Sequence, residues 1–255
     1  MRQFYLEMDE GSLAQPGQTV ALDRDESHHL FTVLRGGRDL TLNLTDGKGR
    51  RYTARPAGKD RRIALVEILT VTEDRTEMTP PLLELVCAVI KGKRFEWALE
   101  KAVELGVHRI TPLITEHGVI EPGSGRRQRW LTIMKSALKQ SGRCWLPQLR
   151  EPATLAEALP AATGGLTLFG AVPGEDVDTR PWWSLLDEPP RPVADSLVLC
   201  IGPEGGWSHE ERDLLAGRGA IPVDLGPHVL RTETAAAAGL SALQTLRQAN
   251  LALGS

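Results

Sequence analysis

Hydrophobic residues alternate with polar ones along much of the first 70 positions. Three leucines occupy every second position between residues 39 and 45, the period-2 pattern of a half-buried strand. Asp46-Gly47 follows, a dipeptide typical of a tight hairpin. Strands are predicted at about 39–45, 50–55 and 63–68, and a helix at about 26–34. The pattern indicates a compact barrel of short strands over residues 1–72.

The pattern changes after a polar stretch at residues 73–81, which ends in Pro80-Pro81 and is typical of a linker. Beyond it, short apolar runs alternate with segments of helical period. Strands are predicted at 82–90, 109–114, 166–169, 196–201 and 220–225, and helices at about 94–105, 127–141, 208–217 and 233–249. Such alternation predicts an α/β domain over residues 82–255, with a mostly parallel sheet covered on both faces.

The overall charge of the chain gives no sign of a nucleic-acid partner, but the local distribution of charge does. With 30 basic and 33 acidic residues the net charge is -3, so only a local cluster of charge can indicate a nucleic-acid partner. Residues 35–62 hold nine basic and three acidic side chains, which predicts an RNA-binding patch on the barrel. A second basic stripe repeats every fourth residue along one helix face, at Lys135, Lys139 and Arg143.

The cysteines and histidines do not form a metal-binding pattern. Three cysteines lie far apart, which favours free buried thiols in a reducing cytosol. The adjacent His28 and His29 are followed by no further ligands at suitable spacing, so no metal is expected. No apolar run approaches about 18 residues, so neither a signal peptide nor a membrane span is expected. The predicted location is cytoplasmic.

Two stretches near the C-terminus carry the candidate chemistry. Residues 199–206 and 224–234 each begin as an apolar strand, break into glycine and proline, and lead into a helix, the arrangement that forms small-molecule sites in α/β proteins. Gly202, Gly205 and Gly206 allow a ligand to lie close to the main chain. Neither a P-loop nor a G-x-G-x-x-G pattern is present, which discounts a dinucleotide oxidoreductase.

These stretches resemble the knot signature of SPOUT methyltransferases. The matching residues are Gly202-Pro203-Glu204-Gly205-Gly206, Leu225-Gly226 and Leu230-Arg231-Thr232-Glu233-Thr234-Ala235. Within that superfamily the chain resembles the RsmE family, the 16S ribosomal RNA uridine N3-methyltransferases. Further matching motifs are His29-Leu30 with Val33-Leu34-Arg35, Lys91-Gly92 with Glu96, residues 100–107, and Gln140-Ser141-Gly142-Arg143.

The resemblance implies a fold, a reaction and partners. The fold is a SPOUT-type mostly parallel sheet with a C-terminal trefoil knot around residues 199–235, preceded by a PUA-like, RNA-binding β-barrel. The reaction is methylation of N3 of a uridine by S-adenosyl-L-methionine, and the partners are 16S ribosomal RNA or the assembled small ribosomal subunit, and a second copy in a homodimer. The implied cofactor shell comprises Leu199, Ile201, Gly202, Pro203, Glu204, Gly205, Gly206, Leu225, Gly226, Val229, Leu230, Thr234 and Ala235.

Arg231 is the residue expected nearest the reaction. Uridine N3 must lose a proton before or during methyl transfer, and a guanidinium near O2 or O4 would stabilise the resulting anion. Glu233 is expected either to orient Arg231 or to stabilise the start of the last helix. For the general base three candidates stay open, namely Glu204, His29 and a water molecule.

The residues expected to contact RNA are eight lysines and arginines and one histidine. They are His29, Arg35, Arg38, Arg50, Arg51, Arg55, Lys91, Lys139 and Arg143. The chain departs from the family pattern where an arginine-serine pair usually follows the third strand of the methyltransferase domain, because it has Glu116-His117-Gly118. His117 can replace that arginine only in part, since a histidine is mostly neutral near pH 7.

Two alternatives remain at this point. One is methylation of another base or of a ribose 2′-oxygen by the same fold, which analysis of the modified nucleoside would distinguish. The other is a non-catalytic RNA-binding module, which failure to bind S-adenosylmethionine would favour.

Overall fold

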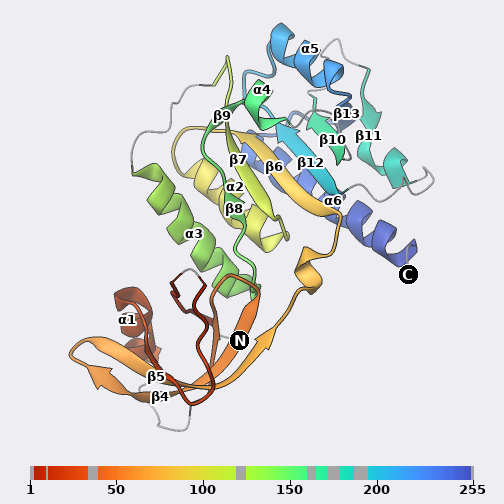
Figure 1. The fold of residues 1–255 in the computed structure, drawn as a ribbon. Coiled ribbons are helices and arrows are strands. Elements are labelled where there is room, and N and C mark those ends of the chain that lie inside the picture. Colours follow the sequence, from red (N-terminus) through yellow and green to blue (C-terminus); the bar gives the residue numbers. More distant parts are fainter. Residues whose placement is uncertain are drawn as a thin grey trace. The chain divides into compact units, whose positions relative to one another are not determined.

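The computed structural model describes residues 3–9, 11–33, 40–118, 125–159, 165–171, 178–186 and 195–253 (Figure 1). The chain divides into two compact units. The first unit comprises Met1–Glu77 and Lys135–Leu146, and the second comprises Met78–Met134 and Pro147–Ser255.

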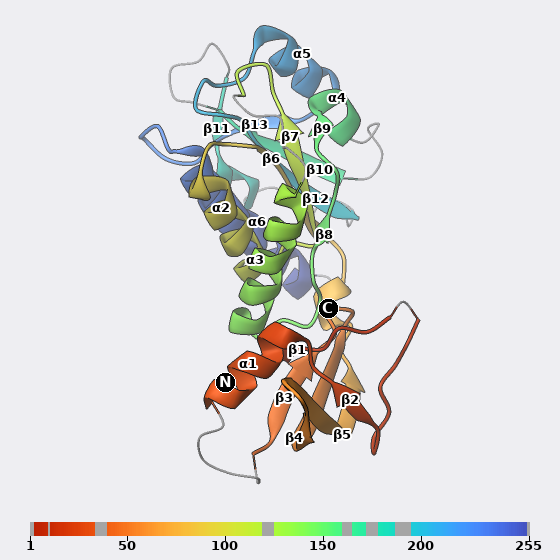
Figure 2. The ribbon, with the colours of Figure 1, turned by 90° about the vertical axis from the view of Figure 1, so that its left-hand side faces the viewer.

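The first unit is built on a five-stranded sheet with the order β1-β3-β4-β5-β2 (Figure 2). Its elements are β1 (Gln3–Tyr5), β2 (Thr19–Ala21), α1 (Arg24–Val33), β3 (Leu42–Thr45), β4 (Arg50–Asp60), β5 (Ile63–Glu73) and most of η1 (Thr76–Met78). The expected turn at Asp46-Gly47 joins antiparallel β3 and β4, with Leu44 opposite Tyr52. Both side chains are 1% exposed and lie in the core of the unit, together with Ile68 of β5. Closure of this sheet into a PUA-like barrel stays a prediction.

Residues 135–146 belong to the first unit, although the sequence pattern placed them in a continuous domain over 82–255. The end of helix α3 (Arg126–Ser141) contributes Lys139, which forms an ion pair with Glu26 of α1. Glu77 then accepts hydrogen bonds from Arg143 Nε at 2.7 Å and from the Cys144 amide at 3.0 Å. These partners lie 66 to 113 residues away in sequence, so local periodicity does not reveal them.

The second unit contains an eight-stranded sheet with the order β11-β13-β10-β12-β6-β7-β8, in which β9 also pairs with β7. Its described neighbours pair in parallel, so the predicted α/β class with a mostly parallel sheet is confirmed. The strands are β6 (Leu82–Ala88), β7 (Arg109–Ile114), β8 (Gln148–Leu149), β9 (Ala153–Thr154), β10 (Gly165–Gly170), β11 (Arg180–Pro181), β12 (Ser196–Ile201) and β13 (Ile221–Asp224). The trefoil knot around 199–235 stays a prediction of the resemblance.

Helices cover both faces of this sheet (Figures 1 and 2). They are α2 (Lys93–Glu104), α4 (Leu155–Ala158), η2 (Trp182–Leu186), α5 (His209–Gly217) and α6 (Thr232–Leu253), together with the first part of α3. Helix α6 packs on β6 and β12 and also contacts α2. At Gly239 the approach is so close that an added Cβ would lie 2.6 Å from the Leu199 side chain.

Two further expectations concern the whole chain. Cys87, Cys144 and Cys200 are free and buried, as predicted, and burial raises the pKa of each thiol to about 12. Among the described helices, none is long and apolar enough to cross a membrane.

Candidate active site

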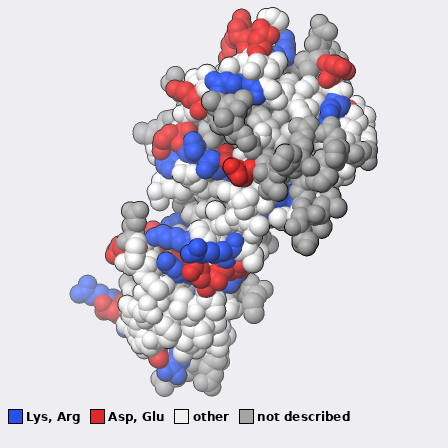
Figure 3. Space-filling view, turned by 45° about the vertical axis from the view of Figure 1, so that its right-hand side comes forward, with Lys and Arg blue, Asp and Glu red and all other residues white. Residues whose placement is uncertain are grey.

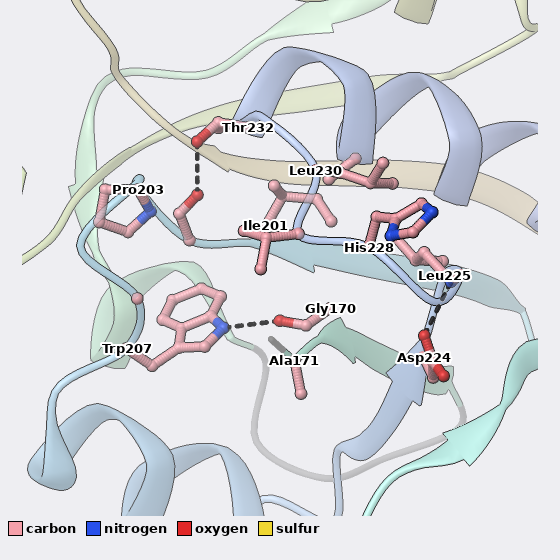
Figure 4. A pocket seen from close by; sticks show the side chains of 15 residues that line it. Gly170, Ala171, Ile201, Pro203, Trp207, Asp224, Leu225, His228, Leu230 and Thr232 are labelled. Carbon is pink, nitrogen blue, oxygen red and sulfur yellow. Dashed lines mark hydrogen bonds between the residues drawn. The ribbon is translucent and has the colours of Figure 1, made fainter. Parts of the chain in front are cut away.

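A pocket lies at the carboxyl ends of β10, β12 and β13, where the two glycine-rich loops meet (Figure 4). Its free space, including the open mouth, is about 520 Å³. Thr232 Oγ1, at the start of α6, donates a hydrogen bond to the Gly202 carbonyl at 3.1 Å. This bond joins the loop after β13 to the loop after β12. The lining residues are Gly170, Ala171, Ile201, Gly202, Pro203, Gly206, Trp207, Asp224, Leu225, Gly226, His228, Val229, Leu230, Thr232 and Ala235.

The loop after β12 is fixed by a tight turn and by Trp207. The Gly206 amide donates to the Pro203 carbonyl at 3.0 Å, and Gly206 has a φ of 73°, which favours glycine. Trp207 is only 3% exposed, and its Nε1 donates to the Gly170 carbonyl at 3.0 Å. The indole therefore connects this loop to the end of β10 and forms one wall of the pocket.

The loop after β13 presents main-chain groups and apolar side chains. Asp224 Oδ1 accepts a hydrogen bond from the Gly226 amide at 2.7 Å and so turns the chain after the strand. No backbone-to-backbone hydrogen bond involves residues 227–230 within the described chain. Val229 is 68% exposed at the pocket. Such a wall suits a ligand with a flat apolar ring and several polar edge atoms.

Most of the cofactor shell expected from sequence lines this pocket. The structure brings together Ile201, Gly202, Pro203, Gly206, Leu225, Gly226, Val229, Leu230 and Ala235. Four other expected residues lie outside the lining. Leu199 is fully buried and packs against Gly239, Glu204 forms an ion pair with Arg94, Gly205 packs against His117, and Thr234 is exposed.

Six lining residues lie outside the cofactor shell that the resemblance implies. They are Gly170, Ala171, Trp207, Asp224, His228 and Thr232. One signal was available for Gly170 and Ala171, because they directly follow a predicted strand, and ligands bind at the carboxyl ends of parallel strands. Thr232 belongs to the matched motif at 230–235 but not to the cofactor shell that the resemblance implies. Its bond to Gly202 depends on the meeting of two loops that lie 30 residues apart in sequence.

Arg231 and Glu233, two of the expected catalytic side chains, have different surroundings. Arg231 is exposed, and its guanidinium forms no ion pair or side-chain hydrogen bond with a described residue. Glu233 is 9% exposed in the first turn of α6, and its Oε2 has no hydrogen-bond partner among the described residues. No bond therefore joins Glu233 to Arg231 there, and the expectation that Glu233 orients Arg231 finds no contact. The position fits the second expected role, stabilisation of the helix start.

His117 contacts the glycine-rich loop from the end of β7. Its Nδ1 lies 3.3 Å from the Gly206 carbonyl oxygen, and a Cβ on Gly205 would lie 3.0 Å from the His117 Cβ. The neighbouring Glu116 amide donates to Glu211 of α5 at 3.1 Å. The segment that departs from the family pattern thus supports the loop after β12.

Most of the expected RNA contacts are engaged inside the first unit. Acidic partners lie beside five of them, in the pairs Arg50–Asp46, Arg51–Asp74, Arg55–Glu67, Lys139–Glu26 and Arg143–Glu77. Basic and acidic side chains also lie side by side on the face shown in Figure 3. The ring of His29 packs against Phe4 in a tilted arrangement, with ring centroids 5.4 Å apart, and Lys91 is exposed. Arg35 and Arg38 lie outside the described residues. The count of nine basic residues therefore overstates the free positive charge of the expected patch.

Comparison with known proteins assigns this arrangement to a family. A family model for an RNA methyltransferase domain matches residues 77–244. Ribosomal RNA small subunit methyltransferase E from Mycobacterium tuberculosis is 31% identical over 92% of this chain and 89% of its own length. This chain belongs to the RNA methyltransferase family. The resemblance to RsmE proteins that the motifs indicated is thereby confirmed.

Two solved structures extend the similarity over nearly the whole chain. The ribosomal RNA small subunit methyltransferase E from Neisseria gonorrhoeae, bound to S-adenosyl methionine, is 32% identical with a TM-score of 0.81, covering 97% of this chain and 98% of that one. A methyltransferase from Legionella pneumophila, in complex with bound SAM, is 35% identical with a TM-score of 0.82, covering 96% and 97%. Within the described residues, no group of three or more metal-ligating side chains comes together.

Proposed function

We propose that this chain transfers the methyl group of S-adenosylmethionine to N3 of a uridine in 16S ribosomal RNA. The observation that carries the proposal is the pocket between the two glycine-rich loops. Arg231 follows the pocket residue Leu230 directly, and its guanidinium is not engaged by any described residue. The Legionella and Neisseria relatives, which hold this cofactor in their structures, support S-adenosylmethionine as the methyl donor. The assignment to small-subunit RNA follows the relatives' names, and N3 of uridine follows the family resemblance.

The pocket residues have properties that suit this cofactor. Leu225, Val229 and Leu230 offer apolar contact to an adenine ring. The main chain of residues 227–230 forms no backbone hydrogen bond with the described part of the chain, which leaves donors and acceptors for the edge of the ring. Gly202 and Gly206 let the cofactor lie against the backbone of the other loop. S-adenosylmethionine has no phosphate, which agrees with the missing phosphate-binding patterns.

Methyl transfer to N3 requires removal of one proton. The new N3–CH₃ bond forms as the sulfonium–CH₃ bond breaks, the N3 proton passes to a base, and S-adenosylhomocysteine leaves. Arg231 would stabilise the negative charge that develops on O2 and O4. Glu204, which forms an ion pair with Arg94, is a candidate base in the second unit; a water molecule and His29 are the other candidates.

The test replaces Arg231 with alanine. We expect kcat for methylation of small-subunit RNA to fall roughly 10²- to 10³-fold, the usual effect of removing one donor to a developing anion. The affinity for S-adenosylmethionine should stay within several-fold of the wild-type value. Arg150→Ala, at another exposed arginine of the second unit, serves as the matched control and should leave kcat unchanged.

The product distinguishes the alternatives. Digestion of the methylated RNA to nucleosides, followed by mass spectrometry, should give 3-methyluridine. A 2′-O-methylated nucleoside or a different methylated base would contradict the N3 assignment. A wild-type chain that binds RNA but no S-adenosylmethionine would indicate a non-catalytic module. Naked 16S RNA and assembled subunits are assayed side by side, because either one is a possible substrate.

We also propose that the chain acts as a homodimer in the cytoplasm, as the resemblance implies. Trp97 of α2 is 40% exposed, and the half-buried Ala237 and Ala238 of α6 leave room for close approach of a second helix. Light scattering coupled to gel filtration should give twice the mass of one chain. A monomer that retains full activity would contradict this proposal.

A further inference from the structure

Helix α1 packs against β5 in the first unit (Figure 1). A groove lies between this helix and the tip of the β4–β5 hairpin. We call it the hairpin groove. Helix α1 contributes Arg24, His28 and Phe31 to its lining, and the hairpin contributes Lys59, Arg61 and Arg62. Only His28 is next in sequence to a residue expected to contact RNA. Lys59, Arg61 and Arg62 belong to the basic residues counted in 35–62, but the lining does not include the ion-paired Arg50, Arg51 and Arg55.

The cations of the hairpin groove are not neutralised by partners. Arg24, Lys59, Arg61 and Arg62 are exposed, and within the described chain none of them forms an ion pair or a side-chain hydrogen bond. Asp60 is the one acidic residue among the lining residues. The groove thus has a net positive charge that is available to phosphates, in contrast to Arg50, Arg51 and Arg55.

An exposed aromatic ring lies among these cations. Phe31 is 41% exposed, whereas the preceding Leu30 is 1% exposed and packs in the core of the unit. The burial of Leu30 fixes the rotation of α1, so Phe31 is held out of the core and at the groove. Aromatic side chains beside basic ones are the usual platform on which single-stranded RNA bases stack.

The hairpin tip also has an unusual backbone. Arg61 has a φ of 54°, the one positive φ of a non-glycine residue among those described. The turn connects Asp60 and Ile63, which are opposite each other in the ladder. Glycine or asparagine normally occupies such a position, since other residues lose about 1 kcal/mol or more there. Because arginine lowers stability at this position, its presence indicates that the side chain has a role.

We propose that the hairpin groove binds a single-stranded segment of the RNA substrate. Phe31 stacks on a base, and the cations of α1 and of the hairpin tip contact the neighbouring phosphates. This inference rests on the proposed function. A membrane surface is a weaker match, because interfacial binding needs several exposed apolar residues, and the groove presents one large aromatic ring.

The experiment measures equilibrium binding of the full chain to 16S ribosomal RNA over a range of salt concentrations. In Arg61→Gly/Arg62→Ala, glycine removes a charge and also relieves the positive φ, so the variant should fold at least as stably as the wild type. We expect Kd to rise at least tenfold, and the slope of log K against log salt to fall by roughly 1.4, which is two phosphate contacts for a single strand. Phe31→Ala should raise Kd by roughly 5- to 150-fold while leaving the salt slope unchanged.

The control is Arg75→Ala, which removes an exposed arginine of the same unit that is paired with Glu73 and is not an expected RNA contact. It should change Kd by less than threefold. Unchanged RNA binding by Arg61→Gly/Arg62→Ala, or an equal loss in the control, would overturn the inference. The inference would also be overturned if the groove variants lost binding to vesicles of anionic lipid while their RNA binding stayed intact.

The affinity for S-adenosylmethionine separates this inference from the proposed function. We expect it to be unchanged in every groove variant. If the groove variants methylate RNA with the wild-type KM, the groove inference fails and the proposed function stands. If the wild-type chain binds RNA through the groove and no S-adenosylmethionine, the proposed function fails instead.

Discussion

Gly202→Ala adds a single methyl group at the point where the two loops of the pocket meet, and so tests how the pocket is formed. Gly202 lines the pocket, and its carbonyl accepts the bond from Thr232. An added Cβ would lie 3.0 Å from Cε2 and 3.2 Å from Cδ2 of Trp207. Its φ is not among the positive values, so alanine is permitted by the backbone and the clash is purely steric.

Trp207 has little freedom to relieve that clash. The indole is 3% exposed, donates to the Gly170 carbonyl at 3.0 Å and packs edge-on against Phe169. Overpacking of this kind costs about 1–3 kcal/mol. For a chain of this size each kcal/mol corresponds to about 2–4 °C, so Gly202→Ala should lower Tm by roughly 2–12 °C. A shift of the loop that costs the bound cofactor about 1.4 kcal/mol lowers its affinity tenfold.

Calorimetric titration with S-adenosylmethionine and thermal unfolding measure both effects. Gly217→Ala is the matched control, because a Cβ at that position, in the last turn of α5, meets nothing within 4 Å. It should leave the affinity unchanged and Tm equal or slightly higher, since alanine is the better helix former. The reasoning is refuted if Gly202→Ala binds S-adenosylmethionine as tightly as the control.

Two further predictions concern contacts that hold each unit together. Thr232→Val removes the hydrogen bond to the Gly202 carbonyl, so thermal unfolding should show a free energy of unfolding lower by about 0.5–1.5 kcal/mol. Titration should show a several-fold weaker affinity for S-adenosylmethionine. Equal values for the variant and the wild type would contradict the pairing of the two loops. Burial raises the pKa of Glu77, but the bond from the Cys144 amide and the charge of Arg143 outweigh it and hold that pKa below its usual 4.5. Because the folded pKa is the lower one, the stabilisation is present at neutral pH and is lost as pH falls below about 4.5. Melting curves between pH 7 and 3 should therefore show a weaker pH dependence for Glu77→Gln, and an unchanged dependence would argue against the ion pair.

The strands and loops of the pocket were predictable because their signals are local. An apolar run followed by glycine and proline identifies the end of a buried strand, and this holds for residues 199–206 and 224–231 alike. The contribution of Gly170 and Ala171 depends instead on which strands are neighbours. Strand β10 lies between β12 and β13, with Leu168 opposite both Leu199 and Ile221, and no local pattern specifies that order.

The charged surface of the first unit was harder to predict for a similar reason. Counting basic residues in 35–62 leaves out the carboxylates from outside that window that pair with them, such as Glu67, Asp74 and Glu77. The helix at 127–141 was expected from its period and is present, yet its last turn joins the first unit through contacts with distant acids. Pairing between distant charges determines which cations remain free, and it becomes visible only in the fold.

The central claim is that one pocket between the loop after β12 and the loop after β13 binds the methyl donor. A crystal structure of this chain with S-adenosylmethionine tests it most directly. The account predicts the adenosine between Gly202–Gly206 and Leu225–Leu230, with the methyl group facing Arg231. Cofactor density at any other site, with this pocket empty, would contradict it.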